Sequence, residues 1–457
     1  MFDCILKNAV VVTPQKAQRL TIAVKNEKIS GLFTPDINLS AKETFDFSGK
    51  IIFPGVIDSH AHVTFCSDFG TGSYTAASGG VTTLVEMPQS GHLPSLFNPS
   101  VLKERIHDIK EHSIVDCALY GGIRANDFTN AEALIQRGVA AFKVFLSDAG
   151  DYGSFDEASL MALFQLLKPH NALVAVHAET QSICAAETQK MAEAGKGAEA
   201  NSDSRPVLSE LLAVGRLCTL ALEEHARISV CHISSKHVVE IIRHFRHKNL
   251  NVTTETCPHY LLLNNDDVVR CGAWAKCAPP IRSQKEVDDL WECVLQGEID
   301  MIGSDHATYS DKQKSSGSFW DVPGGFPGLD LILPGLYSEG VCRRGLSLTQ
   351  LAYITATNPA QIFGLPGKGS IEIGNDADFA ILDPDSSWTF HAEDSFYEPK
   401  SSRYPYEGKT FQGQVISTFV RGKQIYSTGN ILVKHHGRYI SSVNCNPKFH
   451  AEYPGIV

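Results

Sequence analysis

Two histidines separated by one residue follow an apolar run near the start of the chain, in the sequence DSHAH at residues 58–62. The apolar run, residues 51–57, predicts a buried strand, and side chains two positions apart on a strand point to the same face. His60 and His62 can therefore bind one metal ion from the end of one strand. The alternative interpretation is a pair of ordinary polar residues at a strand end.

Other apolar runs of the middle of the chain also end in side chains that can bind a metal. Lys143 lies in AAFKVF, His177 in LVAVHAE, His232 in ISVCHISS and Asp305 in MIGSDH. Burying a bare ammonium is costly, so the pKa of Lys143 falls or its charge is changed. Each of these residues alone can be a hydrogen-bonded polar group of the core. Their recurrence at five strand ends, with the two histidines, predicts a metal site.

The elements that must position these residues are short apolar runs alternating with longer amphipathic stretches. Helices are expected at 209–222, 238–245 and 285–295, and eight strands at 55–58, 82–87, 117–120, 140–145, 172–177, 228–232, 252–255 and 301–305. Eight such units in some 300 residues are typical of an α/β (β/α)8 TIM-like barrel, whose catalytic groups gather at the carboxyl ends of the strands. A doubly wound sheet is the alternative, but no GxGxxG follows the first strand.

Both ends of the chain have a different texture, with β-branched runs separated by polar turns. Strands are expected at 3–12, 20–24 and 28–32, and again at 379–382, 415–420 and 424–426. We therefore predict a β-sandwich domain formed by residues 1–53 and 366–436, flanking a barrel domain of residues 54–365. Residues 437–457 are polar and interrupted by proline, which predicts an extended C-terminal arm.

Composition excludes several classes of protein. Forty Lys and Arg against 51 Asp and Glu give a net charge of −11 without a basic cluster, which argues against nucleic-acid binding. No apolar run approaches the roughly 18 residues that span a bilayer, and the first residues lack the basic start of a secretory leader. The 12 cysteines are scattered without a CxxC pair, as is typical of a reducing cytoplasm. We expect a cytoplasmic globular protein.

The motifs DSHAH, FKVF, VHAE, CHISS and SDHA, with TETCPHYLLL, KCAPPIR and TATNPAQIFGL, extend over nearly the whole chain. Together they resemble the amidohydrolase superfamily, in its branch of dihydroorotases, allantoinases, hydantoinases and dihydropyrimidinases. The resemblance implies a barrel with two divalent metal ions. It implies six ligands: His60, His62 and Asp305 for the first ion, His177 and His232 for the second, and Lys143, carboxylated by CO2 to N6-carboxylysine, bridging both.

Physical chemistry is consistent with this implied site. A carbamate offers two anionic oxygens for metals roughly 3.5–4 Å apart, and it removes the cost of a buried ammonium. The metals would lower the pKa of water to about 7 and polarise the amide carbonyl. Asp305 would take the proton of the attacking water and deliver it to the leaving nitrogen. Zinc suits four histidines with oxygen donors, and manganese, cobalt or iron fit too.

Within this branch, the substrate is indicated by smaller differences. Thr64 stands where dihydroorotases have an Arg that binds a carboxylate, so a dihydroorotase is disfavoured. Asp148 and Gly324 stand where hydantoinases and dihydropyrimidinases have Tyr and Asn. PGGFPGL and VEMPQSGHLPS are similar to allantoinase sequences, which implies the opening of allantoin to allantoate in purine catabolism. The loop after His62 and Ala278 of KCAPP depart from the allantoinase pattern, and a hydantoinase-type enzyme is the alternative.

The resemblance also indicates substrate contacts and partners. Backbone groups of Ala278 and Gly324 are expected to bind the substrate, with Ser147 or Asp148 as side-chain candidates. The expected partner is a small cyclic ureide, with neither nucleic acid nor membrane, and the expected assembly is a homotetramer. A non-catalytic scaffold on the same barrel is an alternative of another class, but such scaffolds have lost metal ligands, and all six positions are occupied here. A mononuclear deaminase would leave Lys143 without a role.

Overall fold

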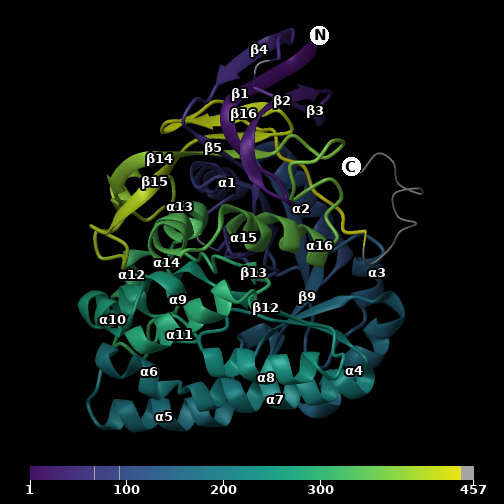
Figure 1. Ribbon diagram of the computed structural model, residues 1–457. Helices are drawn as coiled ribbons and strands as arrows, with labels where there is room; N and C mark the ends of the chain where they lie inside the picture. Colours follow the sequence, from purple (N-terminus) through teal and green to yellow (C-terminus); the bar gives the residue numbers. More distant parts are fainter. Residues whose placement is uncertain (36, 66, 92, 444–457) are drawn as a thin grey trace.

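A ring of eight parallel strands forms the centre of the molecule in the computed structural model, which describes residues 1–35, 37–65, 67–91 and 93–443 (Figure 1). The strands pair in chain order from β6 to β13. Their bounds are β6 Val56–Ala61, β7 Val81–Glu86, β8 Asp116–Gly122, β9 Ala141–Phe145, β10 Leu173–His177, β11 Arg227–Val230, β12 Val252–Thr256 and β13 Met301–Ile302.

The ring closes between its first and last strands. Ala61 at the end of β6 forms a parallel bridge with His306, which follows β13. The backbone N–H of His62 donates to the carbonyl of His306 at 3.0 Å, and the N–H of Asp305 donates to the carbonyl of His60 at 2.8 Å. The predicted (β/α)8 barrel is confirmed. β11 and β13 end before His232 and Asp305, so these two residues lie in the turns after their strands.

Helices surround the barrel. The three helices expected from the sequence correspond to α7, α8 and α11. On α7 the buried residues Ala213, Leu217 and Ala221 recur every four positions, which gives the helix one apolar stripe toward the strands. The helices are α1 Phe69–Ser78, α2 Pro99–His112, α3 Ala131–Ile135, α4 Glu157–Leu167, α5 Gln181–Glu193, α6 Asn201–Ser204, α7 Val207–Glu224, α8 Lys236–Arg246, α9 Pro258–Leu262, α10 Asn265–Cys271, α11 Gln284–Leu295, α12 Asp311–Lys314, α13 Ile332–Leu336, α14 Cys342–Arg344, α15 Leu348–Ala352 and α16 Asn358–Phe363.

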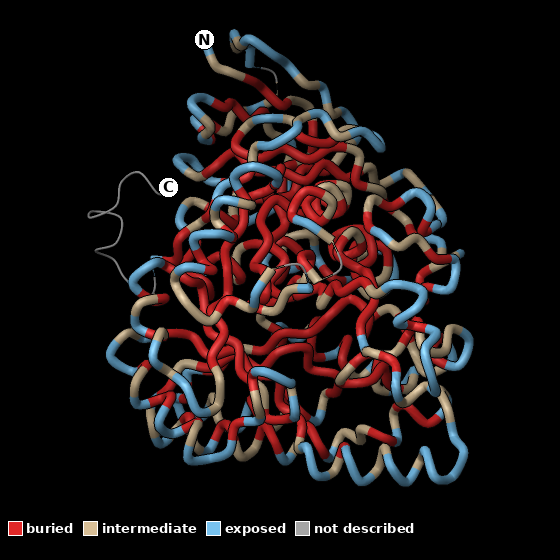
Figure 2. Tube along the Cα trace, turned by 180° about the vertical axis from the view of Figure 1, so that it is seen from behind, coloured by how far each residue is buried: buried red, intermediate tan, exposed pale blue. Residues whose placement is uncertain are grey.

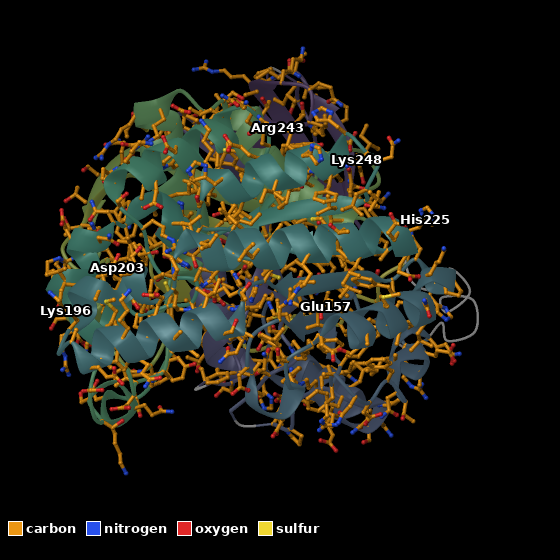
Figure 3. The ribbon with its side chains drawn as sticks, turned by 90° about the horizontal axis from the view of Figure 1, so that it is seen from below. Glu157, Lys196, Asp203, His225, Arg243 and Lys248 are labelled. Atoms are coloured by element: carbon orange, nitrogen blue, oxygen red, sulfur yellow. The ribbon has the colours of Figure 1, made fainter. Side chains whose placement is uncertain are left out.

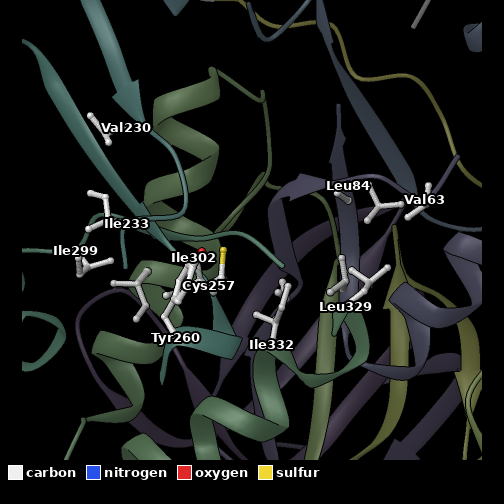
Figure 4. Close-up of a cluster of buried hydrophobic side chains, with 14 of the residues drawn as sticks. Val63, Leu84, Val230, Ile233, Cys257, Tyr260, Ile299, Ile302, Leu329 and Ile332 are labelled. Carbon is white, nitrogen blue, oxygen red and sulfur yellow. The ribbon is translucent and has the colours of Figure 1, made fainter. Parts of the chain in front are cut away.

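Burial follows this layering. The strands at the centre are buried, whereas the helices expose their outer faces (Figure 2). Apolar side chains of strands and covering helices interdigitate, as Ile302 of β13 does near Cys257, Tyr260 and Ile332 (Figure 4). Parallel barrel strands are covered on both faces, so they read as continuous apolar runs in the sequence. In the view from below, α7 and α8 lie side by side, and exposed charged residues such as Arg243 and Lys248 lie on the outer surface (Figure 3).

The second sheet combines both ends of the chain, as predicted. Its order is β17-β16-β15-β14-β5-β1-β2-β3, with β4 paired to β1, and β5 joins the two halves by pairing antiparallel with β14. Phe45 of β4 packs on Phe419 of β15 at a ring distance of 5.0 Å, although three strands separate β4 from β15 in the sheet. Neighbouring strands lie about 4.8 Å apart, so this contact requires the sheet to fold over a core. The strands are β1 Phe2–Val12, β2 Ala17–Lys25, β3 Lys28–Phe33, β4 Ala41–Asp46, β5 Ile51–Pro54, β14 Phe379–Thr389, β15 Thr410–Val420, β16 Lys423–Ser427 and β17 Asn430–Ile431.

A buried charge cluster joins this sheet to the barrel. The ammonium of Lys368 lies 2.5 Å from Asp116, 2.9 Å from Asp376 and 2.7 Å from Asp378. Arg421, which follows β15, pairs with Asp116, the first residue of β8. Burial opposes a positive charge on Lys368, but the three carboxylates outweigh it and raise the pKa of the ammonium. The cluster lies at the amino end of β8, opposite to the strand ends that carry the candidate ligands.

The first residues of the predicted C-terminal arm, 437–443, pack on the barrel. The N–H of Cys117 donates to the carbonyl of Arg438, and the N–H of Ile440 donates to the carbonyl of Cys117. Residues 444–457 of the arm lie outside the described residues. The domain boundaries at 53/54, 365/366 and 436/437 stay predictions. Within the described ranges, no helix is long and apolar enough to cross a membrane.

Candidate metal centre

Three of the predicted ligands meet where the barrel closes. His60 is the fifth residue of β6, His62 follows this strand, and Asp305 lies three residues beyond β13. The Nε2 atoms of His60 and His62 each lie 3.4 Å from Oδ1 of Asp305. The side chain of His60 is buried, while those of His62 and Asp305 are 14% and 16% exposed. One nitrogen from each imidazole and one carboxylate oxygen therefore converge at a spot that solvent can reach.

The imidazole of His60 is oriented by a buried carboxylate. Its Nδ1 lies 2.8 Å from Glu255, which also accepts a hydrogen bond from the hydroxyl of Ser59. Burial, followed by the positive charge of Lys143, lowers the pKa of His60. A neutral His60 that donates from Nδ1 to Glu255 keeps the lone pair on Nε2, which faces Asp305. This is the arrangement in which an outer carboxylate fixes the tautomer of a metal-binding histidine.

The other two histidines form a second group. Nδ1 of His177 lies 3.1 Å from Nε2 of His232. Nε2 of His177 lies 2.8 Å from Glu179, and Arg205 holds this carboxylate with two hydrogen bonds. Burial opposes ionisation of Glu179, but Arg205 outweighs it and lowers the carboxyl pKa. Nε2 of His177 is therefore occupied by Glu179, and the other ring nitrogen, Nδ1, faces His232.

Lys143 lies close to both groups. The ring centres of His60 and His232 are 5.3 Å apart. Burial is the largest cause that lowers the pKa of both histidines, and the charge of Lys143 lowers both further. For His232, the neighbouring His177 also lowers the pKa, by more than Lys143 does. The lysine is 1% exposed, and its Nζ has no hydrogen-bond partner among the described residues. The ammonium lies 5.2 Å from the centre of the Phe145 ring, but no carboxylate is hydrogen-bonded to it, which makes its burial strongly unfavourable. This orphaned nitrogen is the observation that fits a carboxylated lysine.

The backbone is strained at two of these positions. His232 and Asp305 have φ angles of 38° and 49°, in the left-handed region that residues other than glycine rarely adopt. Such conformations cost about 1–3 kcal/mol each and concentrate at functional sites. His306, next to Asp305, turns away instead: its Nδ1 faces the backbone N–H of Gly328 at 3.3 Å.

The donor set fits divalent cations. Nitrogen lone pairs of neutral imidazoles and a carboxylate suit zinc and similar ions. Burial opposes ionisation of Asp305, but its contacts with His62, His60 and His232 outweigh it and hold the pKa of the carboxyl well below its usual range, so the carboxylate is ionised. His60, His62 and Asp305 each offer a ligand atom within 4.8 Å of the others. The structure thus brings all six predicted ligands to one end of the barrel.

The predicted substrate contacts fall into two places. Ser147 is buried in the loop after β9, whereas Asp148 is exposed and its carboxylate accepts from the backbone N–H of Gly150. Ala278 and Gly324 come from different loops but lie side by side: a Cβ on Gly324 would lie 3.7 Å from the nitrogen of Ala278. These two backbone segments can act together, while the contact at Asp148 satisfies its own turn.

Sequence reasoning did not find two residues that support the centre. Arg205 follows an unremarkable stretch, 26 residues after Glu179, and only the folded chain brings the two together. Glu86 ends β7 and accepts hydrogen bonds from the N–H groups of Val63 and Thr64, which fixes the turn after His62. The position of Glu86 at a strand end was a usable signal, whereas Arg205 carried none.

Comparison with known proteins agrees with this geometry. The amidohydrolase family model matches residues 51–425. The chain belongs to the amidohydrolase family. It is 35% identical over 450 residues to an allantoinase of Deinococcus radiodurans, covering 96% of this chain and 98% of that protein. It is 36% identical over 447 residues to an allantoinase of Rubrobacter xylanophilus, covering 96% and 97%.

Solved structures give the same fold. An L-hydantoinase (dihydropyrimidinase) from Arthrobacter aurescens superposes with a TM-score of 0.92 at 31% identity, covering 96% of this chain and 100% of that one. A dihydropyrimidinase from Brevibacillus agri superposes with a TM-score of 0.88 at 29% identity, covering 97% and 99%. The predicted membership of this hydrolase family, and the prediction of an enzyme, are confirmed.

Proposed function

We propose that this protein hydrolyses the ring amide of a cyclic ureide, and that its substrate is allantoin, opened to allantoate in purine catabolism. Full-length similarity to relatives named allantoinase supports the substrate. The observation that carries the reaction class is the meeting of two histidine groups around the unpartnered Lys143 at the carboxyl end of the barrel. A hydantoinase-type substrate is the second candidate, because the structural relatives bear that name.

The residues would hold two divalent metal ions. His60, His62 and Asp305 would bind one, and His177 and His232 the other, with Lys143 as the bridge after its amine has bound CO2 and released a proton. When bound, the ions supply Lewis acidity and lower the pKa of water to about 7. Zinc is the proposed metal, with manganese, cobalt and iron as alternatives, since these donors discriminate weakly among them.

Asp305 is the proposed proton carrier. Its carboxylate is ionised and partly exposed, so it can accept a proton from the attacking water. The water oxygen bonds to the ring carbonyl carbon, the carbon–nitrogen bond breaks, and Asp305 returns the proton to the departing nitrogen. Glu255 and Glu179 hold the rings of His60 and His177 in place throughout. The backbone edge at Ala278 and Gly324 would orient the substrate.

Two experiments test this proposal. Protein loaded with zinc is assayed with allantoin, hydantoin, dihydrouracil and dihydroorotate, and we expect the highest kcat/KM for allantoin. A clear preference for dihydrouracil would refute the proposed substrate. In the second experiment, Lys143→Ala is expected to lose bound metal, measured by elemental analysis, together with activity. Retention of both metals and full ring opening by this variant would refute the bridging carbamate.

Assembly and location are further parts of the proposal. The family resemblance supports a homotetramer, which light scattering coupled to size exclusion can measure. The ten cysteines within the described residues are all free thiols, which supports a cytoplasmic location.

A further inference from the structure

The side chain of Lys276 contacts the loop that follows α12. Its ammonium is hydrogen-bonded to backbone carbonyls rather than to a carboxylate. Its Nζ donates to the carbonyl oxygens of Phe319 at 2.9 Å, Trp320 at 3.0 Å and Val322 at 2.7 Å. Three hydrogen bonds use every donor of an ammonium. Lys276 therefore gathers three backbone carbonyls of one short segment, residues 319–322, around one charge.

Lys314, the last residue of α12, completes this arrangement from the other side. It is 2% exposed, and its Nζ donates to the carbonyl oxygens of Ala273 at 3.1 Å and Pro323 at 3.0 Å. Within the described residues, neither Lys314 nor Lys276 forms an ion pair. The carbonyl of Pro323 belongs to the peptide group that leads into Gly324.

These ammonium groups are costly to bury. Burial lowers the pKa of Lys276 to about 8 and that of Lys314 to about 7. Residues 315–328 form neither helix nor strand, so their carbonyls have no donors from a ladder. An unpaired buried carbonyl is unfavourable. The two lysines thus donate the hydrogen bonds that backbone N–H groups would provide in a helix or a sheet. Four of the carbonyls that accept them lie in one segment of the loop, residues 319–323.

The stretch that they hold leads directly to the opening of the barrel. Gly324 is exposed, and a Cβ at this position would lie 3.3 Å from Cα of Cys277. The N–H of Gly325 donates to the carbonyl of Lys276 at 2.7 Å, and Ala307, two residues after Asp305, donates to Phe326. The adjacent backbone segments at residues 278 and 324 are therefore held by hydrogen bonds on two sides, near Asp305 and near the two lysines.

We propose that Lys276 and Lys314 are positioning residues for substrate binding. They fix the backbone before Gly324, so that peptide groups of Gly324 and Ala278 form a rigid edge for the alternating N–H and C=O groups of a cyclic ureide. A rigid edge binds more tightly because little conformational entropy is lost on binding. This inference rests on the proposed function, since it assigns the recognition of that substrate class.

Methionine substitution tests the inference, because it keeps most of the length of the side chain and removes its donors. Lys276→Met and Lys314→Met are expected to raise KM for the preferred substrate about tenfold, with kcat changed less than about threefold, since each loses hydrogen bonds to backbone carbonyls. Backbone amides of 315–326 should exchange with deuterium about tenfold faster. Metal content should stay at the wild-type value. Lys276→Arg, which keeps a charge and several donors, should restore KM.

Lys312→Met is the matched control, because Lys312 lies on the same short helix but is exposed. Lys314 is almost fully buried, so if its variant does not fold, the half-buried Lys276 tests the same statement. Wild-type KM in Lys276→Met, or a fall in kcat at constant KM, would overturn the inference. So would faster exchange without a change in KM. Hydrogen exchange needs no turnover: if the wild type opens no ring in the substrate panel, the proposed function fails by itself.

Discussion

The charge cluster between the two domains allows a quantitative prediction. Lys368→Met removes an ammonium that lies within 2.5–2.9 Å of three carboxylates, with its own side chain 1% exposed. Removing one partner of a buried ion pair costs about 3–5 kcal/mol, because the remaining charge stays buried and unpaired. Three carboxylates share this ammonium; apart from it, Arg421 pairs with Asp116 and the half-exposed Lys28 pairs with Asp376. We expect a loss of at least about 3 kcal/mol.

This loss converts into a temperature shift. Unfolding entropy is about 2.1 cal/mol/K per residue, so the 457 residues give about 1 kcal/mol/K if the chain unfolds as one unit. The midpoint of thermal unfolding, measured by calorimetry at one scan rate, should fall by about 3–5 °C. Lys28→Met is the control: Lys28 lies 2.6 Å from Asp376 but is half exposed, so it should shift the midpoint by at most about 1 °C. Equal shifts for both variants would refute the reasoning.

Three other predictions use the same kind of argument. Burial raises the pKa of Asp330 to about 6. Ionising this buried carboxyl therefore lowers the free energy of unfolding by up to about 3 kcal/mol as the pH rises from about 4 to above 6. Asp330→Asn should unfold at a higher temperature than the wild type at pH 7.5 but not at pH 4, and a pH-independent difference would contradict this. Asp305→Asn should lower kcat by at least about 100-fold, since general acid–base catalysis contributes about that much, whereas retained activity in a stopped assay would exclude Asp305 as the proton carrier. Glu179→Gln should weaken zinc binding about 10–100-fold in a competition titration with a chelator, because the ring of His177 loses its charged partner, and unchanged affinity would show that Arg205 and Glu179 serve stability alone.

The strands of the barrel could be predicted because they are buried on both faces and so read as apolar runs. β4, with exposed Lys42, Glu43 and Thr44, has no such run, and only its pairing with β1 makes it a strand. The convergence of His60, Lys143 and the other predicted ligands followed from their place at strand ends.

Other features depend on contacts that no local pattern encodes. The positive φ angles of His232 and Asp305 arise in turns after the strands, and neither position is a glycine that would announce them in the sequence. Lys314 reads as one of several charged residues of a polar segment, and only the folded chain turns it inward to Pro323. Asp116 and Lys368 are 252 positions apart, and burial at the domain junction pairs them.

The bridge between Ala61 and His306 has a consequence for assembly. It is the contact that closes the barrel between β6 and the segment after β13, and it lies in the same short segments as His60, His62 and Asp305. A chain whose first and final strands have not met possesses no complete triad there. The visible absorbance of cobalt bound by these three residues would consequently report when the barrel closes during refolding.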